Sequence, residues 1–273
     1  MRKDLFLYGA TVAMQAPPGS PFPIVQPDIY KTADWLADHG FDSLELHVQR
    51  PDLVNGVTLK EHCDNRGLRI STIGTGMAYS YEGLTVTTPE DSVRAKAIQR
   101  LREQINLASV LGCAVVIGSM RGGLAADEDI AAVDRRMVEG MKPLCEYAEA
   151  KNVDICVEAL NRYETRYLRT GEDVLELIEK VGSKRLLVHL DSYHMNIEEA
   201  DMAGAILRCG AHLGHFHACD SNRCYPGSGH IDFKPILEAL RTIGYRRNVT
   251  LEILPVPDGF TAVQRGLAHL KQL

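Results

Sequence analysis

Short runs of apolar, often β-branched residues alternate along the chain with longer stretches in which apolar residues recur every three or four positions. The short runs predict buried strands and the longer stretches predict amphipathic helices. The predicted strands lie at residues 4–9, 42–47, 68–74, 113–119, 153–158, 185–191, 212–218 and 248–254. The predicted helices lie at residues 27–40, 51–66, 90–111, 128–151, 171–182, 200–210, 233–243 and 260–272. The pattern is therefore a succession of strand–helix units.

Prolines and glycines mark the ends of these helices. Pro27 and Pro89 precede predicted helices, and a glycine lies where six helices should stop. Eight units in 273 residues average about 34 residues each, which fits an α/β fold with a single (β/α)8 TIM barrel. No Ser/Gly-rich linker or change in composition marks a boundary. We therefore expect one TIM-barrel domain over residues 1–273.

A doubly wound sheet is the competing architecture. Gly74 and Gly76 follow a predicted strand and could open a dinucleotide-binding turn. The position of the third glycine in that motif is Tyr79, and we predict no helix between this strand and Pro89. The glycines are therefore assigned to a barrel loop.

Composition and charge exclude several classes of protein. Thirty Lys and Arg against 36 Asp and Glu give a net charge of −6, which disfavours a nucleic-acid partner. No apolar run reaches the roughly 18 residues that a membrane helix needs, so no membrane association is expected. The seven cysteines are odd in number and form no C-x-x-C pair, which is typical of a reduced cytoplasmic protein.

Four successive predicted strands end in side chains that can bind a metal. They are Glu158, Asp191, His217 and Glu252. In a parallel barrel the strand ends meet at one mouth, and the alternation along the strands turns the three carboxylates toward the interior. Each residue taken alone is more simply a capped or solvated strand end. Together, three facing carboxylates would repel one another unless a cation lay between them.

The ligand types indicate which cation would bind. Three carboxylates and one imidazole suit Mn²⁺, Mg²⁺ or Co²⁺ better than a structural zinc, which prefers thiolates. The sequence therefore predicts one divalent cation, with Mn²⁺ the first choice.

The segments around these residues resemble a known family. EALNRYE at 158–164, LDSYHMNIEEA at 190–200, HFHACDSNR at 215–223, GSGHIDF at 227–233 and LEIL at 251–254 are similar to the metal-dependent ketose 3-epimerases of the xylose-isomerase-like barrel superfamily. IGTG at 73–76, IGSMRG at 117–122 and NRYET at 161–165 further resemble the epimerases that act on 5-keto-L-gluconate. The resemblance is weaker before residue 68.

The resemblance implies an activity and a role for each site residue. The enzyme would invert the hydroxyl-bearing carbon beside the ketone of a ketose or keto sugar acid, through an enediolate. Glu158, Asp191, His217 and Glu252 correspond to the metal ligands, and Glu158 and Glu252 also to the acid and base. Residues that position the substrate correspond to Glu164, His194 and Arg223. Relatives of this kind are commonly homodimers or homotetramers.

The loop after residue 119 departs from the sugar epimerases, because Ser119, Met120 and Arg121 stand where aromatic residues often shape the pocket. An arginine at the mouth can bind a carboxylate with two hydrogen bonds. Arg121 therefore points to a keto sugar acid as substrate.

Other activities could use the same ligands. An aldose–ketose isomerase, a dehydratase and a C-glycoside lyase all start from the same enediolate. A metal-dependent phosphodiesterase of the abasic-site endonuclease type is a remote alternative, which the net charge disfavours. A sugar-binding protein without activity is disfavoured by the complete pair of acid and base.

Several further residues remain open between a structural and a functional role. Glu45 and His47, at the end of the second predicted strand, could reach the substrate or be structural. His215, two residues before His217 and in the same phase, could support the metal ligands or be a hydrogen-bonded core histidine. The proline-rich segment 17–23 could cover the mouth or form an inert surface loop. Trp35 lies mid-helix, so we assign it to the core.

Overall fold

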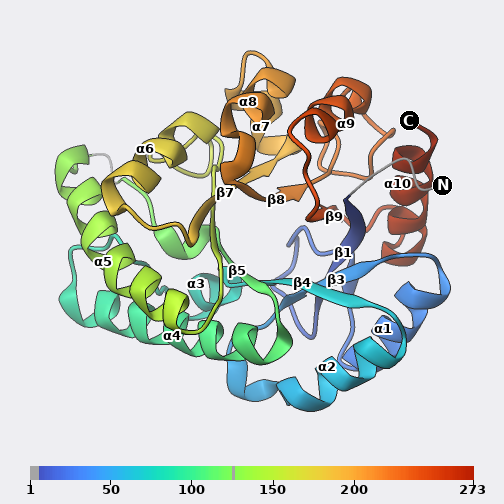
Figure 1. The fold of residues 1–273 in the computed structure, drawn as a ribbon, viewed down its shortest axis with the longest axis horizontal. Helices are drawn as coiled ribbons and strands as arrows, with labels where there is room; N and C mark the ends of the chain where they lie inside the picture. Colours follow the sequence, from blue (N-terminus) through green and yellow to red (C-terminus); the bar gives the residue numbers. More distant parts are fainter. Residues whose placement is uncertain (1–5, 125–126) are drawn as a thin grey trace.

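The computed structural model describes residues 6–124 and 127–273. Its strands form a ring that is enclosed by helices (Figure 1). The described strands are β1 (Leu7–Ala13), β2 (Ile24–Val25), β3 (Ser43–His47), β4 (Arg69–Gly74), β5 (Ala114–Ile117), β6 (Ile155–Glu158), β7 (Leu186–Asp191), β8 (Leu213–His217) and β9 (Asn248–Leu251).

The sheet closes into a barrel. Its strands follow the order β2, β1, β3, β4, β5, β6, β7, β8, β9, and β1 pairs with β9 as well. Every pair is parallel, and Leu7 lies opposite Asn248 where the ring closes. The two-residue strand β2 lies outside the ring, against β1. The TIM barrel predicted from the sequence is confirmed.

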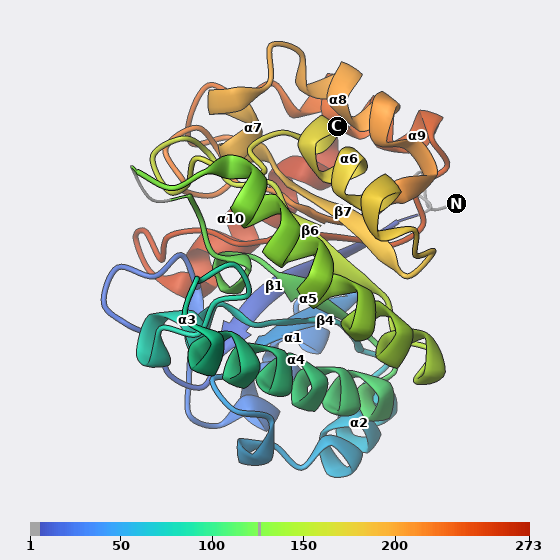
Figure 2. The same cartoon turned by 90° about the vertical axis from the view of Figure 1, so that its left-hand side faces the viewer.

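Helices connect the strands and cover the outside of the barrel, as the perpendicular view shows (Figure 2). The described α-helices are α1 (Ile29–Asp38), α2 (Gly56–Asn65), α3 (Gly76–Glu82), α4 (Asp91–Leu111), α5 (Ile130–Ala150), α6 (Gly171–Val181), α7 (Ser192–Glu198), α8 (Met202–Cys209), α9 (Phe233–Thr242) and α10 (Gly259–Gln272). Short 3₁₀ turns lie at Pro51–Leu53, Ser119–Arg121 and Gly210–His212.

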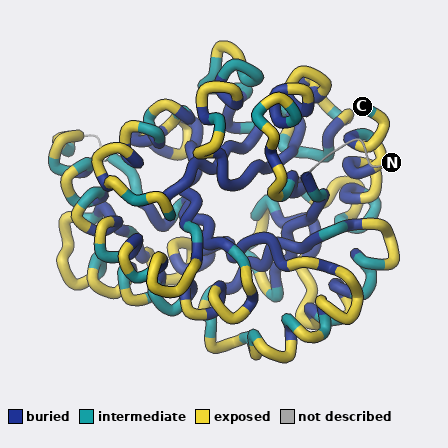
Figure 3. Tube along the Cα trace, viewed as in Figure 1, coloured by how far each residue is buried: buried dark blue, intermediate teal, exposed yellow. Residues whose placement is uncertain are grey.

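The apolar core has two main parts, and a third, small cluster consists of Ala13, Phe22 and Met77. The larger one lies between strands and helices and contains Val157, Val188 and Leu251. The smaller one, with Cys156 and Leu187, lies inside the barrel. Strand residues thus alternate between the two as the sequence predicts, and the ring of strands is buried while the outer helix faces are exposed (Figure 3). Trp35 packs against the larger core, as expected.

The prediction misplaces the first strand and the start of the second helix, because α2 begins at Gly56 and not at residue 51, and it misses two helices. The first strand runs from Leu7 to Ala13 instead of over 4–9, of which residues 4 and 5 lie outside the described chain. Position 9 in this strand is a glycine because a Cβ there would lie 2.5 Å from the Ser43 hydroxyl oxygen. The helices α3 and α7 were not predicted, and α3 begins at Gly76, well before Pro89.

Membrane association and disulfides can be checked on the described residues. None of the described helices is long and apolar enough to cross a bilayer. All seven cysteines lie in the described part of the chain and are free thiols.

Candidate metal centre and active site

The four residues predicted as metal ligands come together at one end of the barrel. Glu158, Asp191 and His217 are the last residues of β6, β7 and β8, and Glu252 directly follows β9. Each offers one ligand atom, and these atoms all lie within 4.8 Å of one another. All four side chains are buried. Parallel strands that end at one level therefore build the cluster.

Several atoms of this cluster lack a hydrogen-bond partner among the described residues. They are Glu158 Oε1, Asp191 Oδ2 and His217 Nδ1. Asp191 uses its other carboxylate oxygen to cap helix α7, where Oδ1 accepts from the Tyr193 amide at 2.8 Å. Buried polar atoms without partners are costly, and a cation bound between them would satisfy all three. The residues present thus fit a divalent cation.

Burial and mutual repulsion shift the protonation of these carboxyl groups when no cation balances them. Burial raises the pKa of Glu158 well above its usual range, and repulsion from Glu252 raises it further. Burial raises the pKa of Asp191 to about 6. Burial acts on Glu252 in the same direction, but the His217 ring and the Arg223 guanidinium outweigh it and lower its pKa to about 2. A bound cation would therefore compete with protons.

Glu45 on β3 orients the imidazole of His217, one of the four candidate ligands. His217 donates from Nε2 to both carboxylate oxygens of Glu45, at 3.2 and 3.1 Å. Its Nδ1 then faces the cluster, 3.8 Å from Asp191 Oδ2 and 3.6 Å from Glu252 Oε2. A carboxylate on the far nitrogen of a ligand histidine fixes its tautomer and orientation. Glu45 is the carboxylate on the far nitrogen, Nε2, of His217.

Glu45 is the centre of a larger buried network. It also accepts from His215 Nε2 at 2.6 Å, from His47 Nε2 at 2.7 Å and from Thr72 Oγ1 at 2.5 Å. Burial alone would raise the pKa of Glu45, but the His217 and His215 rings outweigh it and hold the pKa well below its usual range. Glu45 is therefore a carboxylate anion beneath the cluster.

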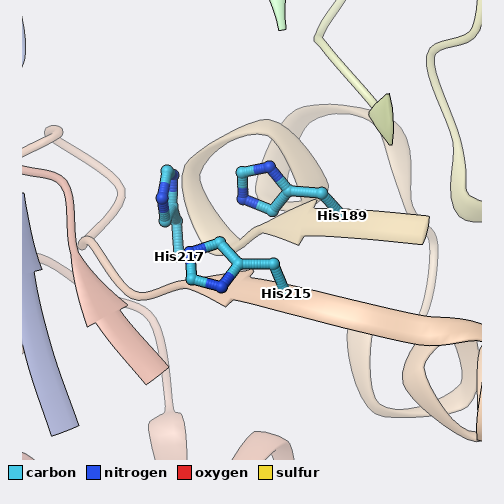
Figure 4. Close-up of side chains that lie close together, drawn as sticks. All are labelled: His189, His215 and His217. Carbon is cyan, nitrogen blue, oxygen red and sulfur yellow. The ribbon is translucent and has the colours of Figure 1, made fainter. Parts of the chain in front are cut away.

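The rings of His189, His215 and His217 lie close together on β7 and β8 (Figure 4). The His189 and His217 rings meet edge to face with centroids 4.2 Å apart. Burial and the neighbouring His217 ring lower the pKa of His189 well below its usual value. His189 is therefore a neutral ring that packs beside the ligand histidine.

His194, predicted to position substrate, lies on α7 beside the cluster. Its Nδ1 accepts from the Asn161 side-chain amide at 2.7 Å and from the Asn161 backbone amide at 3.3 Å. This assigns the ring hydrogen to Nε2, which lies 3.8 Å from Glu158 Oε1. Burial, and secondly the nearby Arg223, lower the pKa of His194 well below its usual value. His194 is thus a neutral donor at the mouth, and sequence analysis had not recognised Asn161 as its support.

Arg223 and Glu164 form an ion pair across the mouth. Arg223 Nη1 lies 3.0 Å from Glu164 Oε1, and Nη2 lies 3.5 Å from Glu252 Oε2. The guanidinium also stacks over the Tyr193 ring, 4.9 Å from its centroid. Arg223 has a φ of 60°, which is unusual for a residue with a side chain. The loop after β8 therefore places this cation against a metal-ligand candidate.

Asp220 holds that loop in place. Its carboxylate accepts from the backbone amides of Ser221 and Gly227, both at 2.8 Å, and of Ile231 at 3.0 Å. Asp220 is fully buried. Sequence analysis had not singled it out, although an acidic residue after a buried strand and before a Gly-rich loop is a signal of this kind.

A cavity of about 160 Å³ opens above the cluster. Glu158, His217, Glu252, Glu164 and Arg223 contribute to its walls. Pro17, Ser20, Pro21 and Phe22 line it as well, so the proline-rich segment lies over the mouth. A second cavity of about 740 Å³ shares Ser119, Leu160 and Glu164 with the first, so the two adjoin.

Arg121 does not lie where a contact with substrate would require it. The 3₁₀ turn at Ser119–Arg121 directs its side chain inward, where the guanidinium is fully buried and donates to the Tyr167 carbonyl. Burial lowers its pKa to about 10, which the nearby Glu158 partly offsets. Arg121 lines neither of the two cavities above. Its position does not support the predicted contact with a substrate carboxylate, because the turn that follows β5 was not foreseen.

A barrel of this topology, with a ligand cluster at the carboxyl ends of its strands, defines a class of metal-binding TIM barrels. Residues 33–273 match the family model described as "Xylose isomerase-like TIM barrel". The chain belongs to this family.

Its relatives include named epimerases. The chain is 32% identical over 216 residues to the L-ribulose 3-epimerase of Methylomonas sp., covering 78% of this chain and 74% of the relative. It is 30% identical over 249 residues to the 3-dehydro-D-guloside 4-epimerase of Escherichia coli, covering 87% and 92%. The crystal structure of a D-allulose 3-epimerase from Methylomonas sp. superposes with a TM-score of 0.82 at 26% identity, covering 98% of this chain and 97% of the other.

Proposed function

We propose that the protein is a divalent-metal-dependent sugar epimerase, which inverts the hydroxyl-bearing carbon beside the ketone of a ketose or keto sugar acid. The observation that carries this proposal is the buried cluster of Glu158, Asp191, His217 and Glu252 at the mouth of the barrel. Two of its carboxylates, Glu158 and Glu252, also line the cavity above it. Mn²⁺ is the cation that we propose, ahead of Mg²⁺ and Co²⁺.

The chemistry requires removal of a weakly acidic proton from the carbon beside the ketone. When bound, a divalent cation polarises the carbonyl group and makes that proton more acidic. We assign proton transfer to Glu158 and Glu252, one on each face of the substrate. One glutamate takes the proton, the other returns a proton to the opposite face, and the roles exchange in the reverse reaction.

The remaining residues of the mouth hold the substrate. His194 donates from Nε2, and Arg223 adds a positive charge, so both stabilise the negative charge that develops on the enediolate oxygens. Glu164 offers a carboxylate oxygen to a substrate hydroxyl, beside its ion pair with Arg223. The proline-rich segment that lines the cavity shields the reacting carbon from water.

The test is to identify the products. The Mn²⁺-loaded protein is incubated with L-ribulose, D-psicose, D-tagatose and 5-keto-L-gluconate, and the products are analysed by NMR. We expect an epimer at the carbon beside the ketone. An aldose would instead identify an aldose–ketose isomerase, and loss of a substituent would identify a dehydratase or lyase. Either result contradicts the epimerase.

We also propose that the protein acts in the cytoplasm as a homodimer or homotetramer. Its seven free cysteines support a reducing compartment. Light scattering of the purified protein tests the assembly, and a monomeric mass contradicts it.

A further inference from the structure

His47 lines the catalytic cavity but has no part in the mechanism above. It is the last residue of β3 and shares the wall of the cavity with Gly74, Glu252 and Phe22. Its side chain is 6% exposed, and its Nε2 lies 4.0 Å from Glu252 Oε1. His47 is therefore next to one of the two glutamates assigned to proton transfer.

The two ring nitrogens of His47 have different surroundings. Nε2 donates to Glu45 Oε1 at 2.7 Å, which fixes the ring against the buried carboxylate. Nδ1 is buried and has no hydrogen-bond partner within the described residues. His47 is therefore a residue of the cavity lining whose second ring nitrogen is a buried polar atom without a partner, and such atoms are uncommon unless a ligand or water satisfies them.

The neighbours of His47 hold the ring in this orientation. Gly74 leaves the space for it, because a Cβ at that position would lie 2.4 Å from Nδ1. On another side, the Phe22 ring of the proline-rich segment packs against the imidazole with centroids 4.3 Å apart. The ring is thus fixed by Glu45, Phe22 and the backbone of Gly74.

We infer that His47 is a further substrate-binding residue, whose Nδ1 accepts a hydrogen bond from a hydroxyl group of the bound sugar. The inference rests on the proposed function. Because Nε2 carries the ring hydrogen, Nδ1 offers a lone pair, which matches a hydroxyl and repels a carboxylate. The part of the substrate against β3 is therefore a hydroxyl-bearing carbon, and the carboxylate of a keto sugar acid would lie away from His47.

Two substitutions separate this role from support of Glu45. The amide nitrogen of Gln can replace Nε2, so His47→Gln keeps the contact with Glu45 and removes the acceptor. The amide oxygen of Asn can replace Nδ1, so His47→Asn keeps the acceptor and removes the contact. His39→Gln is the matched control, because His39 is an exposed histidine that is not among the residues lining the cavity.

The experiment is calorimetric titration of D-psicose, and separately of 5-keto-L-gluconate, into the Mn²⁺-loaded protein, with the Mn²⁺ content of each variant measured beforehand. We expect His47→Gln to raise the Kd for D-psicose about five- to tenfold, the worth of one hydrogen bond, with unchanged Mn²⁺ affinity. His47→Asn should recover part of this loss, and His39→Gln should bind like the wild type.

Several results would overturn the inference. They are an unchanged Kd in His47→Gln, equal losses in both His47 variants, or a second Mn²⁺ per chain that His47→Gln removes, which would make His47 a ligand.

If the Kd rises as expected but the wild type forms no epimer, the proposed function fails and the inference stands. If the wild type epimerises and His47→Gln binds normally, only the inference fails. A wild type that binds neither D-psicose nor 5-keto-L-gluconate in this titration contradicts both.

Discussion

Glu45 is a buried residue that orients three histidines of the site through its hydrogen bonds. It accepts hydrogen bonds from His217, His215 and His47, and it is fully buried beneath the cluster. The hydrogen bond to His217 Nε2 leaves Nδ1 as the only nitrogen that can face a cation. If the cluster holds a cation, its affinity should thus depend on Glu45, which orients His217 and which also lies within reach of His47 and Glu252.

Replacing Glu45 by Gln should therefore weaken metal binding. An amide can donate as well as accept, so it does not hold the three histidines in one tautomer. We expect the Kd for Mn²⁺ to rise about 10- to 100-fold, measured by calorimetry. Glu61→Gln on the exposed face of α2 is the control. A Glu45→Gln protein that is folded and binds Mn²⁺ like the wild type would show that the network does not orient His217.

At this scale the sequence predicts which residues gather at the mouth better than it predicts the residues that support them. Glu158, Asp191, His217 and Glu252 could be found because they share a position at strand ends and a phase within the strands. The role of Glu45 could not be found, because its partners lie on β4 and β8, and only barrel closure brings them together. The position of Arg121 could not be found from the sequence, because a single turn decides whether a side chain at a strand end enters the cavity.

Among the elements, the loop that follows β8 matters most to the site, because it carries Arg223 to the mouth. Its shape depends on Asp220, whose carboxylate accepts from three backbone amides. Burial alone would raise the pKa of Asp220, but the hydrogen bonds from the Ile231, Gly229, Ser221 and Gly227 amides outweigh it and lower the pKa. The ionised carboxylate therefore stabilises the folded loop.

Asp220→Asn should destabilise the protein by about 1–3 kcal/mol near neutral pH, because an amide group would face the backbone donors. A lowered pKa in the folded state means that the stabilisation is present above the unfolded pKa of about 4 and is lost as the pH falls below it. Denaturant unfolding at neutral and acid pH should thus show the difference between variant and wild type shrinking in acid. A difference that is independent of pH would show that the charge of Asp220 does not matter.

The elements themselves follow from the sequence where they are long or repeated. The helix over Asp91–Leu111 was predicted to within a residue, because its apolar face recurs over five turns. Helices α3 and α7 have seven residues each, too few for a periodic pattern. The predicted range of strand β1 is wrong because Gly9, Ala10 and Thr11 have little apolar character. All three are nevertheless buried where the barrel closes.

For the whole molecule, the unsatisfied cluster couples metal binding to protons. Burial raises the pKa of Asp191 to about 6 and that of Glu158 above its usual range, so the metal-free protein holds protons that a cation must displace. The Kd for Mn²⁺ should therefore fall as the pH rises through about 6. Calorimetry in buffers of different ionisation enthalpy measures the protons released. Equal affinity below and above this range, with no proton release, would contradict this description of the centre.

Solvent exchange tests the central claim most directly. The Mn²⁺-loaded protein is incubated in D₂O with D-psicose and with 5-keto-L-gluconate, and NMR follows the carbon beside the ketone. If Glu158 and Glu252 transfer the proton, deuterium enters that carbon as the epimer forms, and the exchange disappears in Glu158→Gln, in Glu252→Gln and on removal of the metal. An epimer that forms without deuterium, or undiminished exchange in both variants, would contradict the account.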